Sequence, residues 1–214
     1  MTSAEGATSA RNDPRNELRT GRGAGPAAGT DGRLRCPWAG SAPDYCAYHD
    51  NEWGVPVHGE VALFERLSLE AFQSGLSWLT ILRKRDAFRR AFAGFHPATV
   101  AAFTDDDVAR LLADAAIVRH RAKIEATVRN ARAVTELAED LDALLWSYAP
   151  DPAGRPAPRT VADVLARTRE SEAMARTLRR RGLVFVGPVT CHALMQATGM
   201  VDDHLAGCFR RGAG

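Results

Sequence analysis

Two pairs of one cysteine and one histidine lie near opposite ends of the sequence. The first pair is Cys36 with His49, and the second is His204 with Cys208. Together they make a Cys₂His₂ set, the ligand combination that tetrahedral zinc prefers. His204 and Cys208 are close enough in sequence for a helix or a tight turn to direct both the same way. The separation of Cys36 and His49 fits no standard zinc-finger template, so on spacing alone a chance pairing stays open.

Most tryptophans and tyrosines of the chain gather around the first pair. They are Trp38, Tyr45, Tyr48, Trp53 and Trp78. Base-reading pockets hold a flipped nucleobase between aromatic faces and read its edge with polar groups, and such faces also attract a cation. The alternative is that these rings form only the core around a metal site. We favour that alternative for Trp53, but not for Tyr48 or Trp78.

A single glutamate interrupts the apolar face of the next expected helix. Glu70 follows Leu67 and Leu69 closely. A carboxylate in such a place is paired, exposed or functional, because burying an unpaired charge is costly. A solvated position on the helix surface is the ordinary alternative for a glutamate.

The segment from Arg180 to Thr190 is typical of a helix–hairpin–helix. A basic helix end leads through Gly182 and a short apolar stretch to Gly187, and Pro188 suits the first position of a new helix. The free N–H groups at such a helix start bind DNA phosphates. The candidate backbone contacts are Gly182, Gly187 and Thr190. An ordinary corner between two helices explains the glycines equally well.

The helices that must position these residues follow from apolar residues that recur every three or four positions. This spacing predicts helices over residues 60–75, 77–92, 105–112, 120–140, 161–165 and 172–181. Ser77, Thr104 and Ser171 are the expected N-caps. A proline-rich loop covers 149–159. Since only 183–186 could form a strand, we predict an all-α protein.

Composition indicates an ordinary globular protein behind a tail. Residues 1–32 contain almost no large apolar side chains, and we predict that they are disordered. Residues 33–214 then form one helical domain. The net charge of +2 is compatible with nucleic acid without arguing for it. The excess of arginine fits either phosphate recognition or a GC-rich genome.

The sequence offers no secretory leader and no apolar run of the ~20 residues that would span a bilayer. Four cysteines in such a chain indicate a reducing compartment. We therefore expect a cytoplasmic protein without membrane insertion. We also expect a monomer, because no patterned self-association surface is visible.

Six motifs, in this order, resemble the DNA-3-methyladenine glycosylase I family. They are Cys-x-Trp from Cys36, Tyr-x-x-Tyr-His-Asp-Asn-Glu-Trp-Gly-Val-Pro from Tyr45, Leu-Glu-x-x-Gln-x-Gly-Leu-Ser-Trp from Leu69, Arg-His-Arg-x-Lys-Ile from Arg119, Phe-Val-Gly from Phe185, and Asp-His-x-x-Gly-Cys ending at Cys208. The resemblance spans about residues 34–208.

This resemblance implies an all-α helix–hairpin–helix glycosylase fold with one structural zinc ion that joins the N- and C-terminal segments. The implied zinc ligands are Cys36, His49, His204 and Cys208. The implied base pocket contains Tyr45, Tyr48, Glu70 and Trp78, with Trp38 and Trp53 nearby. Glu70 would be the catalytic residue, a negatively charged acceptor of hydrogen bonds from the lesion base. A four-ligand zinc site has no open position for a water molecule.

Two positions depart from the expected pattern. The hairpin lacks the first glycine of the usual Leu-Pro-Gly-x-Gly form and has Phe185 near that place. Phe72 stands between Glu70 and Gln73, and we expect its ring to alter the pocket rim.

The resemblance implies base excision repair. The enzyme would flip 3-methyladenine out of alkylated double-stranded DNA and hydrolyse its N-glycosidic bond, leaving an abasic site, without an organic cofactor. No lysine lies beside the pocket in sequence, which predicts a monofunctional enzyme. Four carboxylates near the motifs are candidates for a place under the sugar: Asp50, Glu52, Asp202 and Asp203.

Two alternative functions belong to other classes of protein. A non-catalytic, zinc-stapled DNA-binding module leaves Glu70 and the clustered aromatic residues unexplained. A zinc deaminase needs the H-x-E and P-C-x-x-C motifs, and neither is present.

Overall fold

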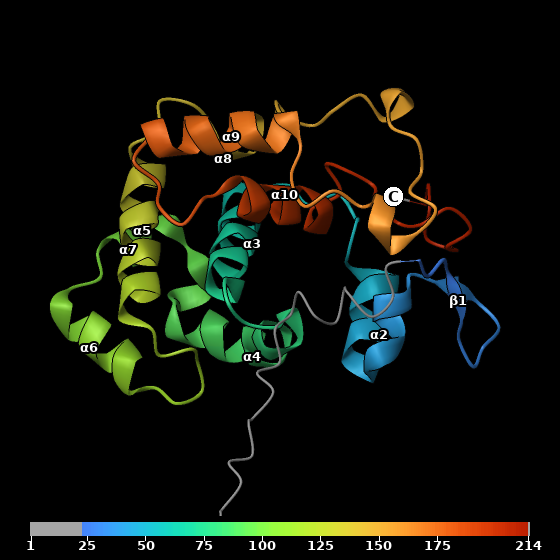
Figure 1. The fold of residues 1–214 in the computed structure, drawn as a ribbon. Coiled ribbons are helices and arrows are strands. Elements are labelled where there is room, and N and C mark those ends of the chain that lie inside the picture. The colour runs from blue at the N-terminus through green and yellow to red at the C-terminus, as the bar shows by residue number, and fades with distance from the viewer. Residues whose placement is uncertain (1–22, 214) are drawn as a thin grey trace, which may run out of the picture.

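The computed structural model describes residues 23–213, and these are mainly helical (Figure 1). The α-helices are α2 (Pro43–Asn51), α3 (Glu60–Gln73), α4 (Trp78–Ala91), α5 (Pro97–Ala101), α6 (Asp105–Ala113), α7 (Arg121–Thr135), α8 (Leu141–Trp146), α9 (Arg169–Arg180) and α10 (Pro188–Ala197). Four 3₁₀ turns accompany them: η1 (Pro37–Ser41), η2 (Ala93–Phe95), η3 (Pro152–Gly154) and η4 (Val161–Asp163). No described helix is long and apolar enough to cross a membrane.

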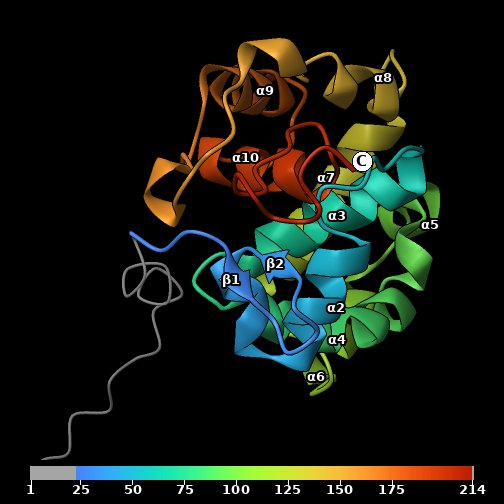
Figure 2. The same ribbon diagram turned by 90° about the vertical axis from the view of Figure 1, so that its right-hand side faces the viewer.

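Helix α3 lies near the centre of the fold and contacts α4, α7, α8 and α10 (Figures 1 and 2). Its residues Leu63, Phe64 and Leu67 are completely buried, because apolar side chains three and four positions apart share one face of a helix. This central helix also carries Glu70, so the candidate reader of the base is fixed to the core.

Part of the predicted tail is ordered backbone. Residues 1–22 lie outside the described residues, but β1 (Ala27–Ala28) pairs with β2 (Leu34–Arg35) in an antiparallel hairpin. The buried guanidinium of Arg35 bonds Asp31 and Asp50, each at 2.7 Å. Charge-assisted bonds of this kind, rather than apolar burial, hold residues 23–32 to the domain, so that the ordered chain begins before residue 33.

Two of the predicted helix caps are confirmed, and the third is wrong. Ser77 accepts a bond from the Thr80 N–H, and Thr104 forms a capping box at the start of α6. Helix α9 instead begins after Thr168, whose side chain accepts from the N–H of Ser171 while Ser171 bonds back. This reciprocal pair makes Thr168 the N-cap, three positions before the predicted cap.

The helix predicted over 120–140 ends early, and a second helix begins just beyond the predicted end. Helix α7 ends at Thr135, and α8 begins after Asp140, whose carboxylate accepts from the Ala143 N–H. An N-cap aspartate starts a new helix because it bonds backbone N–H groups that the helix itself leaves unpaired.

We had expected the Phe72 ring to alter the pocket rim, but the structure places this ring elsewhere. It is fully buried, and its ring lies 4.6 Å from that of Phe88 and 5.8 Å from that of Phe92. Its position on α3 directs the ring into the core between α3 and α4.

Candidate active site and metal-binding cluster

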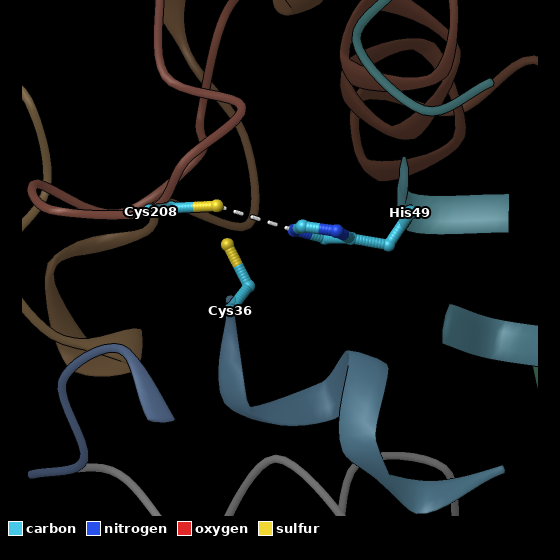
Figure 3. A group of neighbouring side chains, drawn as sticks. All are labelled: Cys36, His49 and Cys208. Atoms are coloured by element: carbon cyan, nitrogen blue, oxygen red, sulfur yellow. Dashed lines mark hydrogen bonds between the residues drawn. The ribbon is translucent and has the colours of Figure 1, made fainter. Parts of the chain in front are cut away.

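Three buried side chains from distant segments form a possible metal-binding group. The ligand atoms of Cys36, His49 and Cys208 all lie within 4.8 Å of one another. Cys36 precedes η1, His49 lies on α2, and Cys208 comes from the C-terminal loop, as Figure 3 shows. The hydrogen bond with the Cys36 thiol lowers the pKa of Cys208, and contact with His49 lowers it further. A thiolate is the form that binds metal ions.

The fourth predicted ligand, His204, lies beside this group. Its ring centroid is 5.0 Å from that of His49. Its Nε2 atom is buried and has no hydrogen-bond partner within the described part of the chain. A β-carbon at Gly54 would lie 2.7 Å from the His204 ring, so only a glycine at position 54 leaves room for that ring. A buried nitrogen without a partner is what ligation of a metal ion would satisfy.

Both histidines are oriented by carboxylates. The His49 Nδ1 atom lies 2.8 Å from an Asp50 oxygen, and the His204 Nδ1 atom lies 2.8 Å from an Asp202 oxygen. Each carboxylate engages Nδ1 and leaves Nε2 available, which is the arrangement that orients metal-binding histidines. Cys36, His49 and Cys208 bring together three of the four ligand atoms that a tetrahedral zinc site needs, and His204 lies beside them.

Trp38 and Trp53 pack against this cluster. The ring of Trp53 lies edge-on to that of His204 at 4.5 Å, and Trp38 lies 5.2 Å from His49. Trp38 also contacts Tyr45 at 5.6 Å, so it joins the cluster to the aromatic residues of the pocket.

Tyr45, Tyr48 and Trp78 continue this aromatic group from α2 to the start of α4. The Tyr48 and Trp78 ring centroids are 5.4 Å apart. The hydroxyl of Tyr45 accepts a bond from the Leu79 N–H at 3.0 Å and ties α2 to α4. The indole Nε1 of Trp78 is buried and has no hydrogen-bond partner among residues 23–213.

Glu70 is buried on α3 near Tyr48. Burial raises the pKa of Glu70 to about 8, although Arg66, one turn earlier, opposes this change. Glu70 in turn adds to the effect of burial in raising the pKa of the Tyr48 hydroxyl. Near neutral pH the carboxyl group of the empty protein is therefore mostly protonated.

Sequence reasoning missed two arginines that bind Glu52. Arg85 donates both Nη atoms to Glu52, at 2.5 and 2.8 Å, and Arg66 donates to the same carboxylate at 3.2 Å. Arginine is abundant in this chain, and nothing in the spacing separates these two from the rest.

The four carboxylates considered for a place under the sugar all have partners in the fold. Asp50 and Asp202 bind the two histidines. Glu52 is held by two guanidinium groups, and Asp203 accepts from an arginine and a glutamine. These contacts give each of them a structural role, so none stands out as a free catalytic base.

Helices α9 and α10 are joined by a short turn with glycine-like backbone. Gly182 has φ +89° and Phe185 has φ +57°. Gly187 is the N-cap of α10, and Pro188 is its first residue, as the sequence predicted. Thr190 lies in the first turn of α10, so Gly187 and Thr190 both flank unpaired N–H groups of a helix start.

Comparisons with known proteins agree with this geometry. The family model described as methyladenine glycosylase matches residues 38–211. The DNA-3-methyladenine glycosylase 1 of Escherichia coli strain K12 is 42% identical over 177 residues, which cover 81% of this chain and 95% of that protein.

Solved structures of similar proteins share the fold. A crystal structure of a 3-methyladenine DNA glycosylase I superposes with a TM-score of 0.77 at 42% identity and covers 83% of this chain and 99% of the other. A Tyr-to-Phe variant of such an enzyme in complex with 3-methyladenine superposes with a TM-score of 0.76 at 34% identity, covering 83% and 97%.

Proposed function

Since the chain belongs to the methyladenine glycosylase family, we propose that it excises 3-methyladenine from alkylated double-stranded DNA. The N-glycosidic bond breaks and releases the free base. Water supplies a hydroxyl group to the sugar carbon, and an abasic site remains in the DNA. The observation that carries the proposal is a buried carboxyl group, Glu70, near Tyr48, whose ring lies 5.4 Å from that of Trp78. A similar enzyme binds 3-methyladenine itself.

Recognition of the lesion follows from its charge. Methylation at N3 gives the adenine ring a positive charge, which aromatic faces attract. A cation beside Glu70 lowers the pKa of that carboxyl group, so the base itself favours the charged form of its reader. Neutral adenine gives no such compensation and would leave Glu70 protonated. The Trp78 indole N–H adds a donor that the fold itself does not use.

The chemical step needs little from the protein. A positively charged base leaves without being protonated, so no strong general acid is required. Flipping, orientation and stabilisation of the developing sugar cation then provide the rate. Both lysines of the chain, Lys84 and Lys123, donate their amines to backbone carbonyl oxygens. These bonds support a monofunctional enzyme, because lyase chemistry needs a free amine.

A structural zinc ion would be held by Cys36, His49, His204 and Cys208. With four protein ligands, the ion would stabilise the fold and offer no position for a water molecule. Its role is therefore to join the two ends of the domain rather than to activate water.

The unit formed by α9, the turn and α10 would act as the helix–hairpin–helix. Gly182, Gly187 and Thr190 would present backbone N–H groups to a phosphate of the DNA. We further propose that the protein works as a monomer in the cytoplasm, without an organic cofactor.

The direct test is release of free 3-methyladenine from methylated DNA by the zinc-loaded protein. Glu70→Gln keeps the shape of the side chain but cannot become negative, and we expect it to lower the rate of release by about 100-fold or more. Glu60→Gln, at the exposed start of the same helix, is the matched control. Undiminished release by Glu70→Gln would contradict the assignment of Glu70. No release by folded wild-type protein would favour a non-catalytic DNA-binding module.

A further inference from the structure

The Arg-His-Arg-x-Lys-Ile segment takes no part in the proposed reaction, yet it places a buried lysine against the end of the helix that carries Glu70. Lys123 lies in the first turn of α7 and is only 6% exposed. Burial lowers the pKa of its amine. A buried ammonium group is costly unless its N–H groups are bonded, so its partners indicate what it does.

The amine of Lys123 donates to two backbone carbonyl oxygens at the end of α3. Its Nζ atom lies 2.7 Å from the Phe72 oxygen and 2.5 Å from the Ser74 oxygen. The last carbonyl groups of a helix have no partner within the helix, and the helix dipole favours a cation at this end. Lys123 therefore caps α3 from a different helix, α7.

The capped segment connects the two pocket residues. Glu70 precedes it on α3, and Trp78 follows it as the first residue of α4. Between them, Ser74 and Gly75 are exposed and contribute little packing. The two bonds from Lys123 therefore attach this turn to the rest of the domain.

We propose that Lys123 is a positioning residue that fixes the relative placement of Glu70 and Trp78 for recognition of the base. This inference rests on the proposed function and extends it to a side chain that touches no substrate. Misplacing a binding group by about 1 Å is enough to lower a rate about 100-fold. Lys123 holds the carbonyl groups on either side of Gln73, so loss of its two bonds would displace the exposed turn that begins at Ser74.

The chain contains a matched control for this lysine. Lys84, the only other lysine in the sequence, donates to the Ala115 and Ala116 carbonyl oxygens at 3.2 and 2.8 Å. Lys84→Met and Lys123→Met therefore each remove one amine and two bonds to backbone carbonyl oxygens. Only Lys123→Met releases the turn between the two pocket residues.

Two measurements on folded protein test the proposal. The first is the indole N–H signal of Trp78 in nitrogen-15 NMR spectra without ligand, and the second is the affinity for free 3-methyladenine by calorimetry. We expect Lys123→Met to move the signal and to weaken base binding about tenfold or more. Lys84→Met should change neither, and Lys123→Arg, which keeps the charge and the donors, should recover most of the affinity.

The outcomes separate this proposal from the proposed function. An unmoved Trp78 signal, or an unchanged base affinity in Lys123→Met, overturns the positioning role. A moved signal, together with wild-type protein that binds no 3-methyladenine, refutes the base-recognition function while the placement of the turn by Lys123 stands. If Lys123→Met does not fold, Lys123→Leu, which also removes the amine and both bonds, is judged by the same criteria.

Discussion

At the scale of single residues, the carboxyl group of Glu70 lies where water cannot solvate its charged form. Its pKa rises from 4.5 to about 8 on folding. Between these values the folded protein holds a proton that the unfolded chain has lost. The contribution of Glu70 to stability is therefore complete below pH 4.5 and is lost as the pH rises through 8. Burial of Glu70 thus destabilises the folded protein at alkaline pH.

Glu70→Gln removes this titration. We expect the variant to gain stability over wild type as the pH rises from 5 to 9, by as much as a few kcal/mol in the free energy of unfolding. Denaturant unfolding at pH 5, 7 and 9 measures the difference. Glu60→Gln, on the exposed part of α3, should follow wild type. A difference between Glu70→Gln and wild type that does not vary with pH would contradict the burial argument.

At the scale of elements, the turn between α9 and α10 has a left-handed backbone at Phe185, near the place where the usual hairpin motif has a glycine. Phe185 has φ +57° and is 40% exposed, so burial of its ring only partly offsets the strain. Buried Leu183 and Val186 anchor the turn on either side. The side chain of Asn130 bonds both the N–H and the carbonyl oxygen of Val184. The surrounding packing therefore imposes a conformation that a phenylalanine by itself disfavours.

Substitutions at Phe185 separate strain from packing. Phe185→Ala and Phe185→Gly both remove the ring, but only glycine adopts a positive φ freely. We expect the glycine variant to be more stable than the alanine variant by about 1 kcal/mol. Thermal or urea unfolding of both proteins measures this. Equal stabilities would mean that the left-handed backbone carries no strain.

At the scale of the whole molecule, the metal-binding cluster connects the two ends of the domain. His49 and Cys208 are in contact although 159 positions separate them, and the N–H of Leu205 donates to the Cys36 sulfur. Phe209 N–H also donates to the Leu34 carbonyl, beside the β1–β2 hairpin. A metal ion held at this point would close a loop that spans most of the chain, and its binding energy would become folding energy.

Cys208→Ser tests this connection. We expect the variant to lose bound zinc and to unfold about 10 °C lower, because losing a buried ligand costs several kcal/mol. Base release should fall only as the folded fraction falls. Cys46→Ser, a half-buried cysteine outside the cluster, should change none of these. Atomic absorption measures the zinc content, and calorimetry measures the Tm. A zinc-free variant with wild-type Tm would contradict the structural role.

The sequence by itself determined the elements with strong local signals. Ser77 and Thr104 start their helices because their side chains bond N–H groups only three positions away. Apolar spacing likewise located α3 and α4. Helix α2, which the spacing did not predict, carries Tyr45, Tyr48 and His49 instead of an apolar stripe. These three buried residues are polar or aromatic, so the helix shows little apolar periodicity.

Only the tertiary structure decided which distant groups meet, and with what electrostatic result. The sequence indicated Cys36, His49, His204 and Cys208 as one ligand set, but the proximity of the first two to Cys208 depends on how the ends of the chain pack. The same holds for the protonation of Glu70. Its protonation depends on desolvation by residues far apart in sequence, and the one strong local signal, the charge of Arg66, acts in the opposite direction.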